Sequence, residues 1–239
     1  MRQNENLVLI GSKVILVPYK EEHVLKYHDW MQSPFLQEMT ASEPLTLDEE
    51  YAMQRSWHED EKKCTFILLA APDDKNTLSS FADMKEGSVM IGDVNIFLND
   101  QDDDPTFGEI EIMIAEERYR RGGRGLEALK ITMAYATTEL GLKTFHAKIS
   151  LTNEPSIDLF TRKLGFYPVS TSQVFQETTL EWSCLPKPSS PPASGIDDDD
   201  SSNDAYGAKA TDEQRQRNHA MRDALIEFWT THVKKDRWP

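Results

Sequence analysis

The segment from Gly108 to Leu126 constrains the fold most, because its hydrophobic period changes within a few residues. Ile110, Ile112 and Ile114 alternate with less apolar side chains, which is the period of two expected of a β-strand. From Gly125 onward, apolar residues recur at helical spacing: Leu126, Leu129, Met133, Ala136 and Leu140. The segment therefore predicts a strand, a short turn and a helix.

The turn between this strand and helix has the chemistry of an anion-binding site. Glycines let backbone N–H groups surround a concave point, and a helix N-terminus adds partial positive charge. Arg120, Arg121 and Arg124 add full positive charges. This combination suits a diphosphate, although solvated arginines on a tight turn would give the same pattern. The sequence contains neither a P-loop lysine motif nor a GxGxxG motif at this turn.

Two motifs in series resemble those of the GNAT N-acetyltransferases. The turn has the spacing Arg120-x-x-Gly123-x-Gly125, which is similar to the acetyl-CoA motif (Q/R)xxGxG. After one predicted helix and one strand comes a block similar to the family segment NxxSxxLYxKxGF: Asn153, Ser156, Phe160, Lys163, Gly165 and Phe166. Taken alone, the second block also fits an ordinary capped helix, and both interpretations can hold together.

Closer features narrow the resemblance. The predicted strands 91–97 and 108–114 resemble the RimJ/RimL-type branch, whose members acetylate protein N-termini. Segments 40–47, 50–54, 64–67, 92–95 and 153–157 are similar to a subgroup proposed to acetylate tubulin. The resemblance implies an α/β (α+β layered) GNAT fold, a mixed central sheet with flanking helices and two strands that splay apart. It also implies acetyl-CoA as co-substrate and a protein N-terminus, that of tubulin among them, as acceptor.

The resemblance also implies roles for individual residues. Backbone N–H groups of residues 121–126 would hold the pyrophosphate, and the strand edge at 112–114 would pair with the pantetheine arm. The cofactor residues so implied are Ile112, Met113, Ile114, Arg120, Arg121, Gly122, Gly123, Arg124, Gly125, Leu126, Asn153, Ser156, Phe160 and Lys163. Asn153 is also expected to act in catalysis.

Direct acetyl transfer needs a base for the amine and a proton for the departing thiolate. Glu109 and Glu111 share one face of the predicted strand, and at most one is expected to be catalytic, Glu109 being the first choice. Many family members have a tyrosine as thiolate acid where this chain has Phe160, which carries no proton to donate. Water, another tyrosine such as Tyr167, or slow catalysis would account for the difference.

The chain divides into three predicted parts. Residues 1–184 form the catalytic domain, 185–211 a disordered acidic Pro/Ser linker, and 212–239 an amphipathic C-terminal helix and tail. Further strands are expected at 7–10, 13–18, 64–70, 89–98, 144–150, 166–170 and 174–182, and helices at 21–31, 46–58, 123–140 and 154–164, with a polar loop at 72–87. The tail helix could dock on the domain or bind a partner, and the residues from Pro186 on are expected to be dispensable for the fold.

Composition excludes some functions. The net charge is −15, which disfavours nucleic acid and anionic membranes and suits a cationic amine, to which the acidic loop 100–104 would contribute. Cys64 and Cys184 are too few for a disulfide framework, and no metal-ligand spacing is present, so no metal is expected. A soluble cytoplasmic enzyme is expected. The alternatives are a lysine acetyltransferase and a GNAT-fold binding module that stabilises microtubules or another partner.

Overall fold

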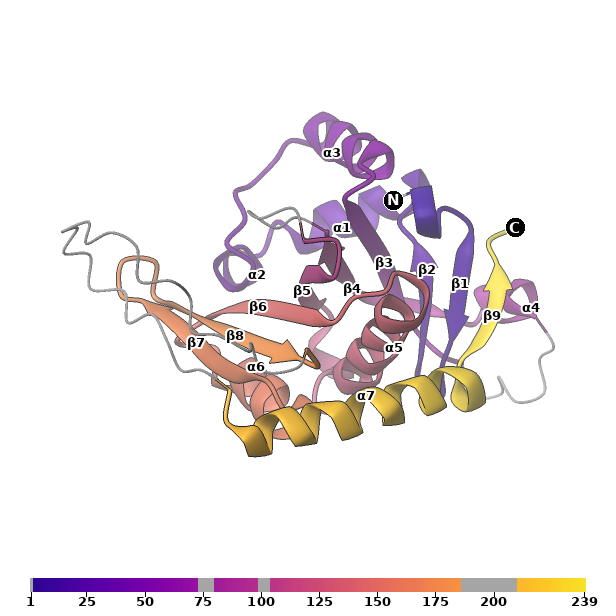
Figure 1. Ribbon diagram of the computed structural model, residues 1–239. Coiled ribbons are helices and arrows are strands. Elements are labelled where there is room, and N and C mark those ends of the chain that lie inside the picture. The colour runs from indigo at the N-terminus through magenta and orange to yellow at the C-terminus, as the bar shows by residue number, and fades with distance from the viewer. Residues whose placement is uncertain (1, 73–79, 99–103, 186–209) are drawn as a thin grey trace.

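A mixed sheet runs through the molecule in the order β7-β8-β6-β5-β4-β3-β2-β1-β9 (Figure 1). The structure is a computed structural model that describes residues 2–72, 80–98, 104–185 and 210–239. The strands are β1 (Leu7–Ile10), β2 (Val14–Pro18), β3 (Lys63–Ala70), β4 (Val89–Phe97), β5 (Phe107–Ile114), β6 (Thr144–Ser150), β7 (Tyr167–Ser172), β8 (Glu177–Ser183) and β9 (Lys234–Arg237). Neighbouring strands are antiparallel, apart from β5 and β6, which are parallel.

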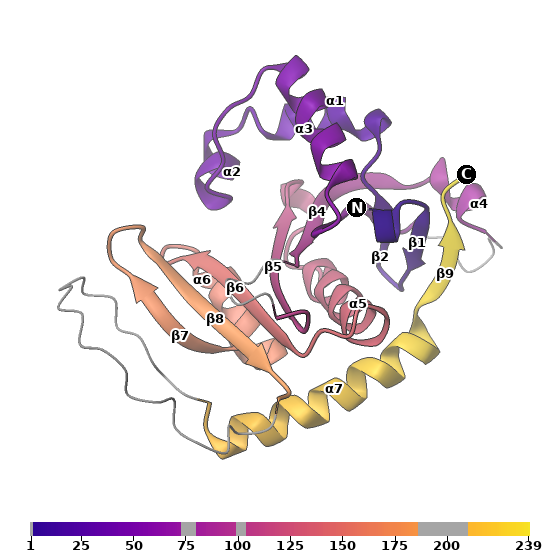
Figure 2. The ribbon, with the colours of Figure 1, turned by 45° about the horizontal axis from the view of Figure 1, so that its top comes forward.

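Helices cover both faces of this sheet, which confirms the predicted layered α/β architecture (Figures 1 and 2). One face carries α1 (Val24–Trp30), α2 (Pro34–Met39) and α3 (Leu47–Glu59), and the other carries α5 (Arg124–Glu139), α6 (Glu154–Asp158), the π-helical turn η5 (Leu159–Lys163) and α7 (Asp212–His232). The short helix α4 (Phe81–Lys85) packs beside β9 and contributes to the α1–α3 side. The predicted capping box of α3 is present, since Thr46 and Glu49 each accept a hydrogen bond from the other's backbone N–H.

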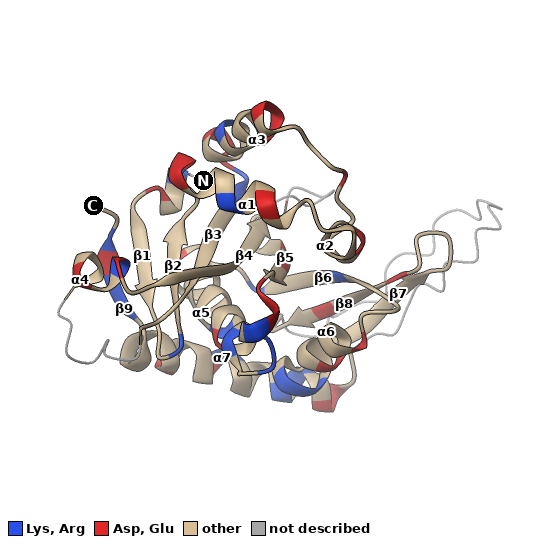
Figure 3. Cartoon of the chain, turned by 180° about the vertical axis from the view of Figure 1, so that it is seen from behind, with Lys and Arg blue, Asp and Glu red and all other residues tan. Residues whose placement is uncertain are grey.

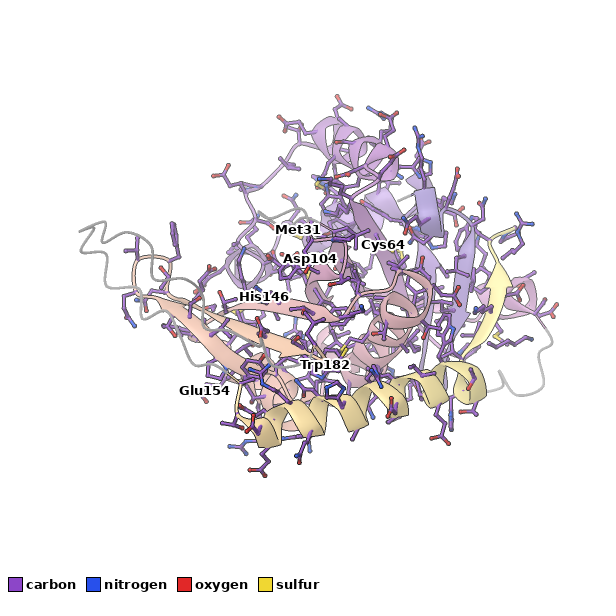
Figure 4. All side chains as sticks on the ribbon, in the orientation of Figure 1. Met31, Cys64, Asp104, His146, Glu154 and Trp182 are labelled. Carbon is purple, nitrogen blue, oxygen red and sulfur yellow. The ribbon has the colours of Figure 1, made fainter. Side chains whose placement is uncertain are left out.

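Alternation along each strand sends side chains to two separate cores. On β5, Ile110 is buried against α5, whereas Met113 is buried in the cluster under α1–α3. On β8, Trp182 enters the α5 core, and its label in Figure 4 lies on the α7 side of the strand. Glu109 and Glu111 alternate in step with Met113, so the face that they were predicted to share is the one covered by α1–α3.

The C-terminal segment is part of this fold. Helix α7 crosses the α5 face, and β9 then pairs antiparallel with β1 at the edge of the sheet (Figure 1). Leu225 and Trp229 are 1% and 4% exposed, and both belong to the main core. The sequence left docking and partner binding open, and the structure shows docking.

Polar contacts fix α7 at both ends. The Trp229 indole N–H donates to Glu139 of α5 at 3.1 Å, and Asn218 donates to the Ser183 carbonyl at 3.2 Å. Because α7 and β9 supply core side chains and a paired strand, the expectation that the residues from Pro186 on are dispensable is contradicted.

Smaller differences from the sequence expectations have local causes. Ser33 caps an unpredicted α2, which begins at Pro34, and α4 occupies part of the expected polar loop. The expected helix 154–164 becomes π-helical from Leu159, and β8 begins at Glu177 rather than at 174.

Most of the expected linker, together with residues 99–103, which include most of the acidic loop, lies outside the described residues. No helix in the described part of the chain is long and apolar enough to cross a membrane.

Candidate active site

The parallel strands β5 and β6 separate after a short paired stretch. Their register joins residues 107–109 to residues 144–146, whereas β5 continues to Ile114 and β6 to Ser150. Ala115 donates its N–H to Ile91 of β4, so by alternation Met113 and Glu111 also direct their backbone groups toward β4. The backbone groups of Ile112 and Ile114 therefore point to the side where β6 has moved away. This is the splay that the resemblance implied.

The turn after β5 presents its backbone as an anion site. Arg121 and Gly123 both have positive φ, 59° and 79°, and Gly123 is the N-cap of α5. Successive N–H groups in such a turn point into a concavity, and the N-terminus of α5 adds its partial positive charge. Figure 3 shows Lys and Arg concentrated in this connection between β5 and α5.

Two details show unfilled space and unused donors at this turn. The Nε atom of Arg124 is buried and has no hydrogen-bond partner among the described residues. A Cβ on Gly125 would lie 3.7–3.9 Å from side-chain atoms of Ile114, Ile112 and Leu159. The missing side chain therefore leaves a cradle between α5, β5 and η5, next to the open edge of β5.

Arg120, the first residue of the motif, is used differently from the expectation. Its Nε donates to the Ile114 carbonyl at 2.8 Å, and a terminal nitrogen donates to the Ala115 carbonyl at 3.1 Å. The Phe35 ring of α2 lies 5.3 Å from the guanidinium carbon. These contacts engage the guanidinium with the end of β5, whereas Arg121 is exposed at the turn.

Lys13 contacts this turn from a distant segment, and the sequence analysis did not identify it as a site residue. Its ammonium donates to the Gly122 carbonyl at 3.0 Å, because the β1–β2 turn packs against the start of α5. Glu127 holds that packing, since its carboxylate accepts from the backbone N–H groups of Ser12, Lys13 and Val14 at 3.0, 2.6 and 2.9 Å. No local pattern around Lys13 predicts this contact, because Lys13 and Gly122 are 109 residues apart in the sequence.

The second motif is divided between surface and core. Asn153 caps α6, and its side-chain oxygen accepts from the Ser156 N–H at 3.2 Å. Ser156 is half-buried and Lys163 is exposed. Phe160 is 2% exposed and packs edge-to-face on Phe166 with ring centroids 4.9 Å apart. Its ring thus fills the core under η5, and the Met113 side chain is likewise buried while its backbone pairs with β4, so contacts of these two side chains with the cofactor stay predictions that this packing does not favour.

The two candidate carboxylates have different surroundings. Glu109 forms an ion pair with Lys148 of β6 at 2.9 Å. Glu111 has an exposed side chain and no ion-pair partner within 4 Å among the described residues. Even so, the protein around it removes part of the hydration of its carboxylate, and this desolvation raises the pKa of Glu111. The negative charge of Glu109 raises that pKa further. Because Glu109 is held in an ion pair and the pKa of Glu111 is raised, Glu111 is better suited than Glu109, the first choice from the sequence, to accept a proton from the amine.

A buried polar chain lies beside Glu111 on the same face of the sheet. Asn95 of β4 is paired with Glu111 in the β4–β5 register. Its amide donates to Asp93 at 2.7 Å, and its oxygen accepts from the Thr65 hydroxyl at 2.5 Å. Asp93 is 2% exposed, and burial raises its pKa to about 7. Its second carboxylate oxygen is buried without a partner among the described residues.

Tyr167, the expected substitute proton donor, is already engaged. Its hydroxyl donates to Glu181, which also pairs with His146 at 2.9 Å. Burial and this hydrogen bond raise the pKa of Tyr167 well above its usual range. In Figure 4, His146 lies on the side of β6 away from α7, the face that also carries Glu109.

The sequence matches a family model described as "Acetyltransferase (GNAT) domain" over residues 13–167. The chain belongs to the GNAT acetyltransferase family. It is 54% identical over 180 residues to Alpha/beta-tubulin-N-acetyltransferase 9 of Mus musculus, covering 75% of this chain and 72% of the relative. The protein of the same name from Homo sapiens is 54% identical over 181 residues, covering 75% and 84%. This GNAT protein is an acetyl-CoA-dependent acetyltransferase.

Solved structures support the same fold. Spermidine N-acetyltransferase from Vibrio cholerae, solved with CoA and spermine, superposes with a TM-score of 0.58 at 16% identity, covering 72% of this chain and 94% of that one. A domain from Methanocaldococcus jannaschii gives a TM-score of 0.57 at 22% identity, covering 72% and 99%.

The residues of this GNAT domain fit acetyl-CoA. The cradle at Gly125 adjoins the open edge of β5, and the neighbouring Arg124 has a buried Nε without a hydrogen-bond partner in the described part of the chain. A pyrophosphate would take the N–H groups of the turn, and a pantetheine amide would extend the sheet at Ile112 and Ile114.

Proposed function

We propose that the protein transfers the acetyl group of acetyl-CoA directly to the α-amine of a protein N-terminus, with tubulin as the acceptor. The observation that carries the transfer step is the position of Glu111 on β5, next in sequence to Ile112 of the open backbone edge, with an exposed side chain that forms no ion pair with another described residue. The names and 54% identity of the mouse and human relatives support tubulin. The RimJ/RimL-like strands 91–97 and 108–114 support an N-terminal amine.

Bound acetyl-CoA would supply the thioester carbonyl that the amine attacks. Ile112 and Ile114 orient the pantetheine arm through their backbone groups, and Glu111 accepts the proton that the attacking amine loses. The departing thiolate needs one proton, and Glu111 has taken one proton from the amine. Phe160 carries no transferable proton, and the Tyr167 hydroxyl is hydrogen-bonded to Glu181. In this proposal Glu111 therefore passes its proton to the thiolate through a water molecule.

Matched peptides test this proposal. One peptide carries the N-terminal sequence of α-tubulin with a free α-amine and no lysine, and the other has the same sequence with a blocked N-terminus and one lysine. We expect acetylation of the first peptide. A preference for the second would assign the protein as a lysine acetyltransferase. Absence of turnover on both, with acetyl-CoA still bound, would favour the binding-module interpretation.

A further inference from the structure

The end of β5 is joined to the α1–α2 layer at two points. Arg120 spans the carbonyls of Ile114 and Ala115 and lies under the Phe35 ring. Close to this contact, Glu116 accepts from the Trp30 indole at 3.0 Å and pairs with Lys26 at 2.7 Å.

Each of these two contacts links α1 or α2 to residues 115–120, which lead from β5 into the anion-binding turn. Lys26 and Trp30 belong to α1, whereas Phe35 is the second residue of α2. Phe35 is 52% exposed, and the Arg120 guanidinium lies 5.3 Å from its ring. A guanidinium binds two carbonyls through its planar fork and presents its face to an aromatic ring, whereas an ammonium is a point charge without a planar fork or a flat face to stack.

The position of α2 connects this clamp to the acceptor. Glu111 lies on the sheet face that α1–α3 cover, so an amine that reaches it approaches from that side. In Figures 1 and 2, α2 lies on the β6–β8 side of α1 and α3, where β6 diverges from β5. The Ile114 carbonyl held by Arg120 is at the same time the last acceptor on the open edge of β5.

We propose that Arg120 is a positioning residue that joins the open edge of β5 to α2 and so shapes the acceptor entrance, and that it is not a phosphate ligand. The assignment of α2 to the acceptor rests on the proposed function, whereas the clamp itself does not. Arg121, Arg124 and the backbone of the turn remain for the phosphates.

Two variants of the full chain test the clamp. Arg120→Lys keeps the charge but loses the fork, and Arg120→Gln loses both. Arg118→Gln is the matched control, because Arg118 is exposed in the same segment and its guanidinium lies over Tyr119 instead. The readouts are amide hydrogen exchange of residues 35–39, the Kd of acetyl-CoA, and kcat and KM for the free-N-terminus peptide.

We expect faster exchange in α2 and a KM for the peptide raised about tenfold in both Arg120 variants, with the Kd of acetyl-CoA within about threefold of the parent. Phe35→Ala should give a similar rise, and the double variant should add little to it, since the two residues form one contact. A merely structural role would lower the melting temperature without separating KM for the peptide from the Kd of acetyl-CoA.

A loss of acetyl-CoA affinity in Arg120→Gln, with restoration in Arg120→Lys and unchanged exchange in α2, would overturn the proposal and make Arg120 a phosphate ligand. If the parent protein acetylates neither peptide, the proposed function fails. Hydrogen exchange and acetyl-CoA binding still decide the clamp in that case.

Discussion

The Lys13 ammonium lies 3.0 Å from the Gly122 carbonyl, although 109 residues separate the two in sequence. The contact brings a cation from the β1–β2 turn to the start of α5, where the backbone N–H groups of the turn converge. A Cβ on Gly123 would lie 2.9 Å from the same ammonium. Lys13 therefore adds a positive charge from a distant segment to those of the motif arginines at the turn.

Lys13→Met should weaken acetyl-CoA binding by about threefold to tenfold, because an exposed cation next to a phosphate contributes about 0.5–1.4 kcal/mol. The loss should shrink at high salt, where the charge is screened. Calorimetric titration at low and high ionic strength measures both effects. Lys143→Met removes the same charge near the opposite end of α5 and should leave the affinity unchanged; equal losses in the two variants would mean that only the overall field matters.

Glu111→Gln should lower turnover by about 10²–10⁴-fold while the Kd of acetyl-CoA is retained, because the base is removed and the backbone edge is not. Glu109→Gln should have a smaller effect, since Glu109 is neutralised by Lys148. In the parent protein, kcat/KM should rise with pH through the raised pKa of Glu111, because the base acts when deprotonated. Near-parental turnover in Glu111→Gln would exclude this carboxylate.

Gly125→Ala should separate cofactor binding from stability. The added Cβ makes ordinary contacts with Ile112, Ile114 and Leu159, so the fold accommodates it. Alanine in place of glycine stabilises a helix by about 0.5–1 kcal/mol, so the melting temperature should rise or stay constant. The same Cβ occupies the cradle, and the Kd of acetyl-CoA should increase about tenfold or more. A more stable protein with unchanged affinity would show that the cofactor passes elsewhere.

The sequence predicted the parts of the site that depend on local spacing. The period change at 108–126 predicted β5, the turn and α5, and the family resemblance predicted two splayed strands, which the structure identifies as β5 and β6. What it could not predict depends on packing between distant segments. The pairing of Glu109 with Lys148 joins two strands, the contact of Lys13 with Gly122 joins two turns, and neither has a local signature.

The role of Phe160 shows that sequence motifs also do not predict side-chain direction. A motif alignment identifies the position but not the direction of the side chain, and the π-helical turn η5 directs this ring against Phe166. The amphipathic pattern of α7 indicated a helix with an apolar side. It could not indicate which surface covers that side, because an apolar face fits an intramolecular core and a partner equally well.

Removal of the residues after Leu185 should strongly destabilise the protein, because it deletes β9 and the core side chains of α7. Trp229→Ala alone should cost about 3–5 kcal/mol of unfolding free energy, since the indole is buried and hydrogen-bonded. Ile226→Ala is the matched control on the exposed side of the same helix, where Ile226 is 39% exposed. Denaturant unfolding compares the three proteins, and parental stability of the truncated chain would contradict the docking of α7.

Asp93 should make the stability of the fold depend on pH. Burial raises its pKa from 3.8 to about 7, so between these values the folded state binds a proton that the unfolded state has lost. The free energy of unfolding should therefore fall as pH rises across this window, by at most about 1.4 kcal/mol for each pH unit.

In Asp93→Asn this part of the pH dependence disappears, because the amide does not titrate. Denaturant unfolding at about pH 5 and about pH 7.5 measures the difference, and because other groups titrate in both proteins, the comparison between them isolates Asp93. Equal pH slopes in the two proteins would mean that the carboxylate ionises in the folded state without cost.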